Sequence, residues 1–314
     1  MLDWRRPQVE DIPGIREYME RAGMRGSDAA AANLFLLREK YNTKIAEQDG
    51  FLFRKYCGRG LAGRDGLAFP LGEGDIAHAV QLALEDRTEK KKDLKFIYLT
   101  EKQAKILSAL KEVEILTDPG NTDYLYTAEH LAELAGRNNQ KKRNHVKHFA
   151  AMYPDCTLKV QTAFDEQFCK DIVEVEESWF DSQEERVDSA FVERDEIYEA
   201  CNHWEDLGLI GAVVYTGDGT PVAMSIASKI SEGVFDIHFE KSYGDYARGG
   251  GFAFINQRFA ACLRSDFGAE WINREEDIGL EGLRRAKMSY HPDLLLQKYH
   301  CVYAVVEDGC EAAG

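Results

Sequence analysis

The stretch "LIGAVVYTGDGTPVAMSIASKISEGVFDIHFE" (Leu209–Glu240) decides the fold expected for this chain. Its apolar, β-branched runs are joined by the short connections "GDG" and "KISEG", which are typical of hairpin turns. The stretch therefore predicts an antiparallel meander with strands over 209–216, 220–228 and 233–240. The glycine loop "ARGGG" (Ala247–Gly251) then opens a helix, "FAFINQRFAACL", and "EWIN" is expected to form the next strand.

The first half of the chain repeats this order of elements. "GFLFRKY" and "GLAFPL" are expected to be strands, and the loop "GEGD" opens the helix "IAHAVQLALED". The strand "LKFIYLT", the helix "EKQAKILSAL" and the strand "VEIL" follow. The two copies share no obvious residue identity, so the repetition is architectural. A proline-marked break at "MYPDCT" divides the chain into predicted domains 1–152 and 153–314.

Two folds use this order of elements. "GEGDIA" (Gly72–Ala77) fits the G-x-G-x-x-A pattern of dinucleotide-binding domains, but no acid ends the next strand at the required spacing. The other fold is that of the GNAT acyltransferases, in which a meander leads into a pyrophosphate-binding loop and helix N-terminus. The meander upstream of the second loop favours this fold. We therefore predict an α/β chain of two tandem GNAT-like domains, with mixed central sheets flanked by helices.

The composition limits the classes of function. The 314 residues have a formal net charge of −16, which disfavours wholesale binding to nucleic acid or an anionic membrane. No apolar run resembles a signal peptide or a membrane-spanning helix. The seven cysteines are scattered, without C-x-x-C spacing. We therefore expect reduced thiols in a cytoplasmic protein, with no metal site and no tightly bound cofactor.

One basic segment stands out in this acidic chain, "GRNNQKKRNHVKHF" (Gly136–Phe149). It is either a solvated helix face that balances nearby acids or an anion-binding element. No acid occurs over 137–148, where a solvated face would intersperse acids at i+4. This absence favours a phosphate ligand. The predicted anion- or phosphate-binding residues are Lys141, Lys142 and Arg143, together with the loop glycines Gly249, Gly250 and Gly251.

Polar residues interrupt the apolar pattern on the strand "GVFDIHFEK". Alternation places Asp236, His238 and Glu240 on one face of this strand. The face is either an ordinary solvated surface or part of a cleft beside the glycine loop. In the following helix Asn256 lies on the apolar stripe, where it either bonds a nearby backbone group or binds a substrate.

The corner "WINREEDIGLEGLRRAKMSY" (Trp271–Tyr290) concentrates charge, with polar residues throughout 273–277. Asp277 is expected to cap the next helix, since acids suit a helix N-terminus. The same principle disfavours Arg274 unless it is paired. Lys287 lies on an apolar helix face and is costly to bury without a carboxylate partner. The corner is either a structural ion pair or a polar pocket for a charged substrate group.

Several of these motifs together resemble one family. "DYLYTAEHLAELAGRNNQKKRNHVKHF", "HFEK", "INQRF" and "INREEDIGLEGLRRAKMSYHPDLLLQKY" are similar, in this order, to the C-terminal catalytic domain of phosphatidylglycerol lysyltransferase. The resemblance implies two tandem GNAT-like domains related to the Fem-type aminoacyltransferases. The membrane-embedded part of the lysyltransferase is absent from this sequence, so lipid modification is not implied. The loop "DYARGGG" also lacks the Q/R-x-x-G-x-G/A pattern of acetyl-CoA enzymes, because Tyr246 occupies its first position.

The expected activity is transfer of an activated acyl or aminoacyl group to an amine or hydroxyl. The donor is left open between acyl-CoA and aminoacyl-tRNA, and the expected partners are tRNA and a small-molecule acceptor of unspecified identity. Glu240 is predicted to be the base or an ammonium ligand beside His238, Lys287 to line a polar wall, and Tyr290 to donate its hydroxyl. The predicted substrate-binding residues are Asn256, Asn273, Arg274, Glu275 and Glu276.

Two further expectations complete this hypothesis. The first half has no counterpart of the charged corner, so the N-terminal domain is expected to be degenerate and supportive. The alternative function is a non-catalytic protein that keeps the fold and binds a small amino-acid-like ligand or an RNA end. The same polar residues would serve both functions.

Overall fold

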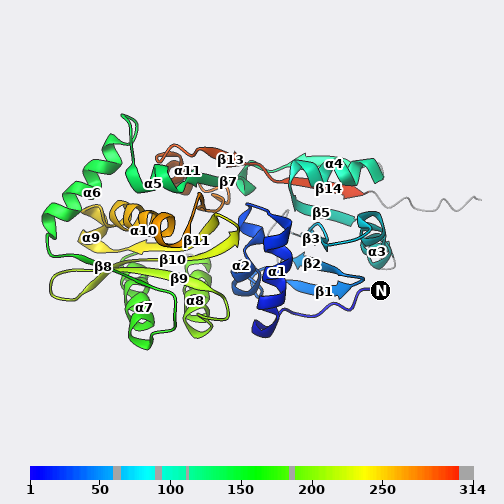
Figure 1. Ribbon diagram of the computed structural model, residues 1–314, viewed down its shortest axis with the longest axis horizontal. Helices are drawn as coiled ribbons and strands as arrows, with labels where there is room; N and C mark the ends of the chain where they lie inside the picture. The colour runs from blue at the N-terminus through cyan, green and yellow to red at the C-terminus, as the bar shows by residue number, and fades with distance from the viewer. Residues whose placement is uncertain (59–64, 89–93, 111–112, 184–187, 304–314) are drawn as a thin grey trace, which may run out of the picture. The chain divides into compact units, whose positions relative to one another are not determined.

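The structure is a computed structural model that describes residues 1–58, 65–88, 94–110, 113–183 and 188–303. The chain divides into two compact units, each built from separate stretches of sequence. The first unit comprises Met1–Pro7, Arg38–Pro119 and Gln297–Gly314, and the second comprises Gln8–Leu37 and Gly120–Leu296. The elements of both units are labelled in Figure 1.

The second unit contains a seven-stranded sheet within the described ranges, in the order β13-β7-β12-β11-β10-β9-β8. Neighbouring strands are antiparallel except β11 and β12, which run parallel. The predicted meander is thus confirmed as β9–β10–β11, and "EWIN" as β12. The strands are β7 (Asp123–Thr127), β8 (Thr157–Gln161), β9 (Leu209–Tyr215), β10 (Pro221–Ser231), β11 (Val234–Ser242), β12 (Trp271–Asn273) and β13 (Leu294–Leu296).

Helices cover both faces of this sheet: α5 and α10 lie over one face, and α7 and α8 lie over the other (Figure 1). The helix α10 buries Phe254, Phe259 and Leu263 in a core shared with α5 and α6, and it ends where Gly268 turns left-handed at φ 70°. The helices are α1 (Ile12–Ala22), α2 (Ala31–Leu36), α5 (Ala128–Glu133), α6 (Gln140–Met152), α7 (Glu166–Asp181), α8 (Asp188–Asn202), α9 (Gly244–Arg248), α10 (Gly251–Phe267) and α11 (Glu281–Met288).

The first unit has its own sheet, in the order β1-β2-β3-β5-β14-β6, with β4 also paired to β2. Only β3 and β5 are parallel among its described pairs. The core includes Phe53, Phe96 and Leu107. The elements are β1 (Lys44–Gln48), β2 (Phe51–Cys57), β3 (Asp65–Leu67), β4 (Leu71–Gly72), β5 (Leu94–Leu99), β6 (Glu114–Thr117), β14 (Tyr299–Tyr303), α3 (Ile76–Thr88) and α4 (Glu101–Leu110), with short 3₁₀ helices at Val9–Asp11, Ser27–Ala29 and Pro119–Asn121.

Each sheet is completed by a strand that is distant in sequence. The strand β7 follows β6 along the chain, yet it pairs with β12 and β13 in the second unit. The strand β14 follows β13, yet it pairs with β5 and β6 in the first unit. The two exchanged strands occupy equivalent places, because each lies one strand beyond the parallel pair. The apolar stretch "KYHCVYAVV" (298–306) also predicts a strand from the sequence, and the structure describes this stretch to Tyr303.

The compact units differ from the predicted division at residue 152, which falls inside the second unit. The physical reason is the exchanged strand β7, whose Leu125 and Tyr126 are fully buried between β12 and β13. Its burial keeps α5 and α6 with the second sheet, where Phe149 joins the core.

The fold class is confirmed: both sheets are mixed, flanked by helices, and follow the GNAT order of a meander and one parallel step. The dinucleotide-binding alternative is wrong, because that fold needs a mainly parallel sheet and the sheet beside Gly72 has one parallel pair among its described strands. The described cysteines are all free thiols. Across the described ranges, no helix has the length and apolar character to cross a membrane.

Candidate functional site

Several polar side chains of the second unit lie close together where β11 runs beside the corner that follows β12. The ladder between β10 and β11 skips one residue, since Ile226 pairs with Phe239 and Ala227 with Ile237. His238 is therefore the extra residue of a β-bulge. Such bulges redirect side chains next to functional sites.

A buried ion pair forms the centre of this cluster. Arg274 donates from Nη2 to Glu240 Oε1 at 2.8 Å, and Asn256 donates from Nδ2 to Glu240 Oε2 at 2.9 Å. Burial is the largest influence and would lower the pKa of Arg274, but the Glu240 carboxylate together with the Tyr290 and Tyr126 hydroxyls raises it, so the guanidinium stays charged. Within the part of the chain that the structure describes, Arg274 Nη1 and Asn256 Oδ1 are buried without a hydrogen-bond partner.

Aromatic rings enclose the guanidinium. Arg274 Cζ lies 4.7 Å from the ring centre of Tyr290 and 5.9 Å from that of Tyr126. Lys142 Nζ lies 3.7 Å from the same Tyr290 ring centre. Burial, together with the positive charge of Arg274, lowers the pKa of Lys142 to about 8, although Glu240 opposes the shift. Burial also raises the pKa of the Tyr290 hydroxyl, which therefore keeps its proton.

Lys287 is buried, as its helix face predicts, but its partners differ from the expected carboxylate. Its ammonium donates to the backbone carbonyls of Arg274 at 2.5 Å and Glu276 at 2.6 Å. Its own carbonyl accepts the Tyr126 hydroxyl at 2.7 Å. Burial lowers the pKa of Lys287. The side chain thus holds the corner to α11 and β7 rather than forming the ion pair considered from the sequence.

The corner itself has a strained backbone. Glu275 adopts φ 58°, a left-handed conformation that is uncommon outside glycine. Its N–H donates to Asn273 Oδ1 at 2.7 Å, and Asn273 Nδ2 donates to Asp123 Oδ2 at 2.8 Å. Glu276 Oε2 accepts the Ser27 hydroxyl at 3.3 Å. Asn273 and Glu276 therefore support the corner through segments that are distant in sequence.

Asp277 does not cap the next helix, which begins at Glu281 with Leu280 as its N-cap residue. The buried carboxylate instead accepts from the Tyr124 hydroxyl at 2.6 Å and Arg284 Nε at 2.7 Å. Three strong donors near one carboxylate, including the Gly279 N–H, keep its pKa low despite burial. This network fixes the far end of the corner.

The basic helix α6 separates the three predicted anion-binding residues. Lys142 points to the Tyr290 ring, and Lys141 is exposed. Arg143 donates to the carbonyls of Leu134 and Gly136, so it closes the end of α5 instead of facing a ligand. The three residues are thus directed to three different surroundings.

The glycine loop before α10 packs against α6. Gly250 has φ 109°, and a Cβ atom at this position would lie 2.5 Å from the carbonyl oxygen of His145. A Cβ atom on Gly251 would lie 2.4 Å from Ser242 Oγ. Gly249 precedes them and ends α9. The loop therefore needs glycine for close packing within the protein.

A pocket of about 540 Å³ lies elsewhere on the second unit, and no predicted site residue lines it. His130 there bonds Asp293 Oδ2 through Nδ1 at 2.8 Å and Asn139 Nδ2 through Nε2 at 2.9 Å. Since Asn139 donates, the neutral ring has its proton on Nδ1. No spacing in the sequence indicates this pair, because His130 follows β7 whereas Asp293 precedes β13, far along the chain.

The class of protein follows from the two mixed sheets and the polar corner: the chain has a tandem GNAT-like fold. It belongs to the family described as phosphatidylglycerol lysyltransferase, C-terminal, whose profile matches residues 19–302. The predicted resemblance is thereby confirmed. No curated protein matches the chain.

Solved structures agree with this assignment. A conserved protein of unknown function from Bacteroides thetaiotaomicron is 29% identical, with a TM-score of 0.85 over 97% of this chain and 100% of that one. L-PGS from Bacillus licheniformis is 14% identical, with a TM-score of 0.65 over 95% and 92% of the two chains. A C-terminal DUF2156 domain from Agrobacterium fabrum is 16% identical, with a TM-score of 0.64 over 94% and 92%. The last two likenesses concern the fold alone.

Proposed function

We propose that this chain transfers an activated aminoacyl group to an amine or hydroxyl, with Arg274, Lys142 and Tyr290 at the reaction site. Family membership supports the reaction class. The observation that supports the site is that two groups lie against the same aromatic ring, that of Tyr290. One is Arg274, whose Nη1 has no hydrogen-bond partner among the described residues, and the other is the Lys142 amine, whose pKa is about 8.

The chemistry divides between these two groups. Arg274 Nη1 donates to the acyl carbonyl oxygen and stabilises the negative charge that develops there in the tetrahedral intermediate. The neutral form of Lys142 takes the proton of the attacking amine or hydroxyl. Collapse of the intermediate forms the new acyl bond and breaks the bond to the donor oxygen or sulfur. The leaving group then takes a proton from the Lys142 ammonium, so the proton count balances.

Glu240 takes a different role here from the predicted base. Both carboxylate oxygens accept hydrogen bonds, from Arg274 and from Asn256. A carboxylate engaged in this way orients the guanidinium and is poorly available to a substrate proton. Lys287 and Asn273 hold the backbone of the corner, which keeps Arg274 in place.

Aminoacyl-tRNA is favoured over acyl-CoA as the donor. The loop that would hold a pyrophosphate in an acetyl-CoA enzyme packs tightly against the His145 carbonyl at Gly250. The loop also has Tyr246 where those enzymes have Gln or Arg. The exposed Lys141 on α6 remains available to a tRNA phosphate.

The test is a transfer assay with the full chain, using labelled aminoacyl-tRNA or acyl-CoA and a pool of small amines and hydroxyl compounds. Label is expected to pass from aminoacyl-tRNA to an acceptor, and Lys142→Met is expected to lower the rate about a hundredfold. Lys170→Ala, which removes an exposed lysine on α7, is the matched control and keeps the wild-type rate. Absence of transfer from either donor, or equal rates in both variants, would overturn the proposal.

The alternative is a non-catalytic protein that binds an amino-acid-like ligand or an RNA end. It predicts saturable binding of aminoacyl-tRNA without any release of label to an acceptor. Calorimetry with the same donors separates binding from transfer, so one set of samples decides between the two functions.

A further inference from the structure

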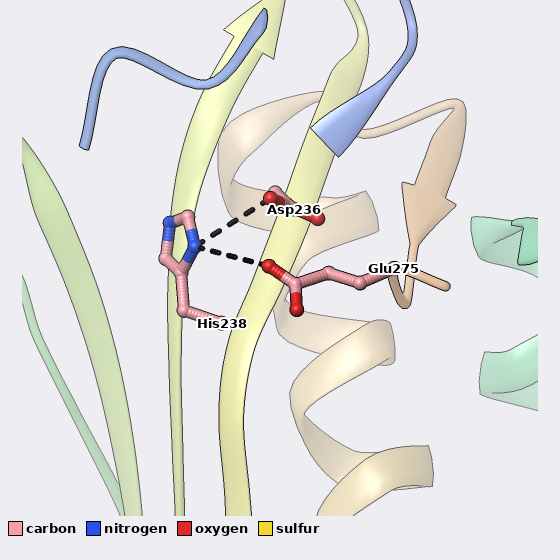
Figure 2. Close-up of side chains that lie close together, drawn as sticks. All are labelled: Asp236, His238 and Glu275. Atoms are coloured by element: carbon pink, nitrogen blue, oxygen red, sulfur yellow. Dashed lines mark ion pairs between the residues drawn. The ribbon is translucent and has the colours of Figure 1, made fainter. Parts of the chain in front are cut away.

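Three side chains outside the Arg274 cluster converge in the second unit: Asp236, His238 and Glu275 (Figure 2). His238 Nδ1 lies 3.5 Å from Asp236 Oδ2 and 3.9 Å from Glu275 Oε1. The three ligand-type atoms all lie within 4.8 Å of one another. The site brings together the bulge of β11 and the strained residue of the corner.

The histidine is oriented towards the two carboxylates but makes no hydrogen bond there. Its side chain is 1% exposed, and among the described residues Nδ1 has no hydrogen-bond partner. Its other nitrogen, Nε2, is 2.8 Å from Ser228 Oγ. When Nε2–H donates to this hydroxyl, the lone pair of Nδ1 faces two negative oxygens. That arrangement is unfavourable unless a positive charge lies between them.

One side-chain amide lies between the two carboxylates. Asn33 Nδ2 is 2.9 Å from Asp236 Oδ2, 2.9 Å from Glu275 Oε1 and 3.1 Å from the Ser27 carbonyl. The amide has only two hydrogens for these three acceptors. A half-turn of the amide would present its oxygen to the same position, as a further oxygen ligand.

We propose that Asp236, His238 and Glu275 form a divalent cation site that takes a borderline transition metal such as Zn²⁺, Mn²⁺ or Co²⁺. Metal bonds of about 2.1 Å at a tetrahedral angle separate ligand atoms by roughly 3.4 Å, close to the separations seen here. One imidazole with two carboxylates suits this group of metals, and two negative charges match a 2+ ion. Ser228 then orients the ligating ring through its other nitrogen, as is usual at such sites.

This site differs from the sequence-based expectation, which included no metal. No closely spaced cysteines or histidines mark it in the sequence, because these ligands come from a bulged strand and a distant corner. The cation would fix Glu275 in its left-handed conformation, next to Arg274. This effect on Arg274 rests on the proposed function, whereas the cation site itself does not.

The test is metal binding by the full chain after treatment with a chelator and dialysis. Co²⁺ added in steps is expected to give visible absorption bands of a low-symmetry site, saturating at one equivalent per chain, and Zn²⁺ is expected to displace it. Glu275→Gln is expected to weaken binding at least tenfold, and His238→Gln is expected to abolish the bands. Glu281→Gln, an exposed carboxylate on α11, is the matched control and keeps wild-type binding.

A second measurement distinguishes loss of the cation site from misfolding of a variant. The melting temperature of the wild-type chain should rise with Zn²⁺ concentration, and this rise should be absent in Glu275→Gln, whose side chain is partly exposed and tolerates the change. Failure of the wild type to bind one equivalent of any of the three ions would overturn the inference. Equal binding by Glu275→Gln and Glu281→Gln would overturn it as well. Neither readout uses transferase activity, so a failed transfer assay leaves this test unaffected.

Discussion

The two sheets follow one pairing scheme, yet only the second has a charged corner after its parallel step. In the first unit the parallel pair makes one register contact between described residues, Leu67 with Phe96. After β5, Thr100 and Gln103 exchange hydrogen bonds between their side chains and backbone N–H groups, and α4 starts at once. In the second unit the parallel pair extends over three positions, from Val234 with Trp271 onward.

In the second unit, the helix that follows β12 does not begin until Glu281. The intervening corner contains Arg274, a left-handed Glu275 and the buried Asp277. The fold therefore needs only a short capped turn at this point. The longer corner contains a strained backbone residue and buried charges, both of which are unfavourable for stability. Such unfavourable features usually persist where a functional site requires them.

The largest expected effect comes from removing the Arg274 guanidinium, the positively charged group at the centre of that corner. Arg274→Ala leaves Glu240 buried without its ion-pair partner, so we expect a loss of about 3–5 kcal/mol of unfolding free energy together with loss of transfer activity. Urea denaturation measures the stability change. The matched variant in the first unit is Lys105→Ala at the exposed Glu101 pair on α4, which should leave the denaturation midpoint unchanged. Similar losses in both variants would remove the distinction between the two units.

A second variant tests the lysine that joins corner and helix. Lys287→Met keeps the length of the side chain but leaves the carbonyls of Arg274 and Glu276 without their donor. We expect about 2–3 kcal/mol of destabilisation, since a buried acceptor loses its hydrogen bond. Thermal unfolding followed by circular dichroism measures it. An unchanged melting temperature would show that the corner does not depend on Lys287.

The exchanged strands offer a closely matched pair. Tyr126 in β7 donates to the Lys287 carbonyl of α11 at 2.7 Å, and Tyr303 in β14 donates to the Leu107 carbonyl of α4 at 3.1 Å. Each Tyr→Phe change should cost about 1 kcal/mol, because each removes one buried hydrogen bond. Only Tyr126→Phe should also lower transfer activity, since the lost hydroxyl bonds Lys287, whose ammonium holds the Arg274 carbonyl. Equal activity of the two variants would count against the proposed reaction site.

The smallest effect expected is a change in pH dependence. The pKa of Lys142 is lowered from 10.5 to about 8, so half of the amine is neutral near pH 8 instead of near pH 10.5. The transfer rate should therefore rise with pH, reach half its maximum near pH 8 and level off above it. A rate profile from pH 6 to pH 9 checks this, with Lys142→Met expected to lose the rise. A wild-type rate that is flat across this range would exclude Lys142 as the base.

The sequence predicts the elements whose signal is local. The alternation of "GVFDIHFE" predicts β11, and the glycine before "FAFINQRF" predicts the start of α10. Thr127 followed by Glu129 has the pattern of a helix start, and this prediction is confirmed because the Thr127 Oγ1 accepts from the His130 N–H. The polar corner is also predicted from Arg274 and Lys287, neither of which a surface turn explains.

Long-range pairings could not be predicted in the same way. "DYLYT" has the composition of a buried strand, but no local feature states which sheet it enters. Asn33 and Ser27 reach the corner from the N-terminal segment, and nothing in their spacing indicates Glu275 or Glu276 as partners. Lys287 was expected to need a carboxylate partner. Its ammonium instead donates to the backbone carbonyls of Arg274 and Glu276, 13 and 11 residues earlier in the chain.

The exchange of β7 and β14 also has a consequence for how the chain is made. During synthesis β5 and β6 emerge early, but the strand that lies between them, Tyr299–Tyr303, emerges almost two hundred residues later. Until then, both strands expose unpaired backbone edges that invite association with other chains. Completion of the first sheet must therefore wait until β14 has been synthesised. A ribosome that stalls before residue 299 would release a first unit that lacks an interior strand of its sheet.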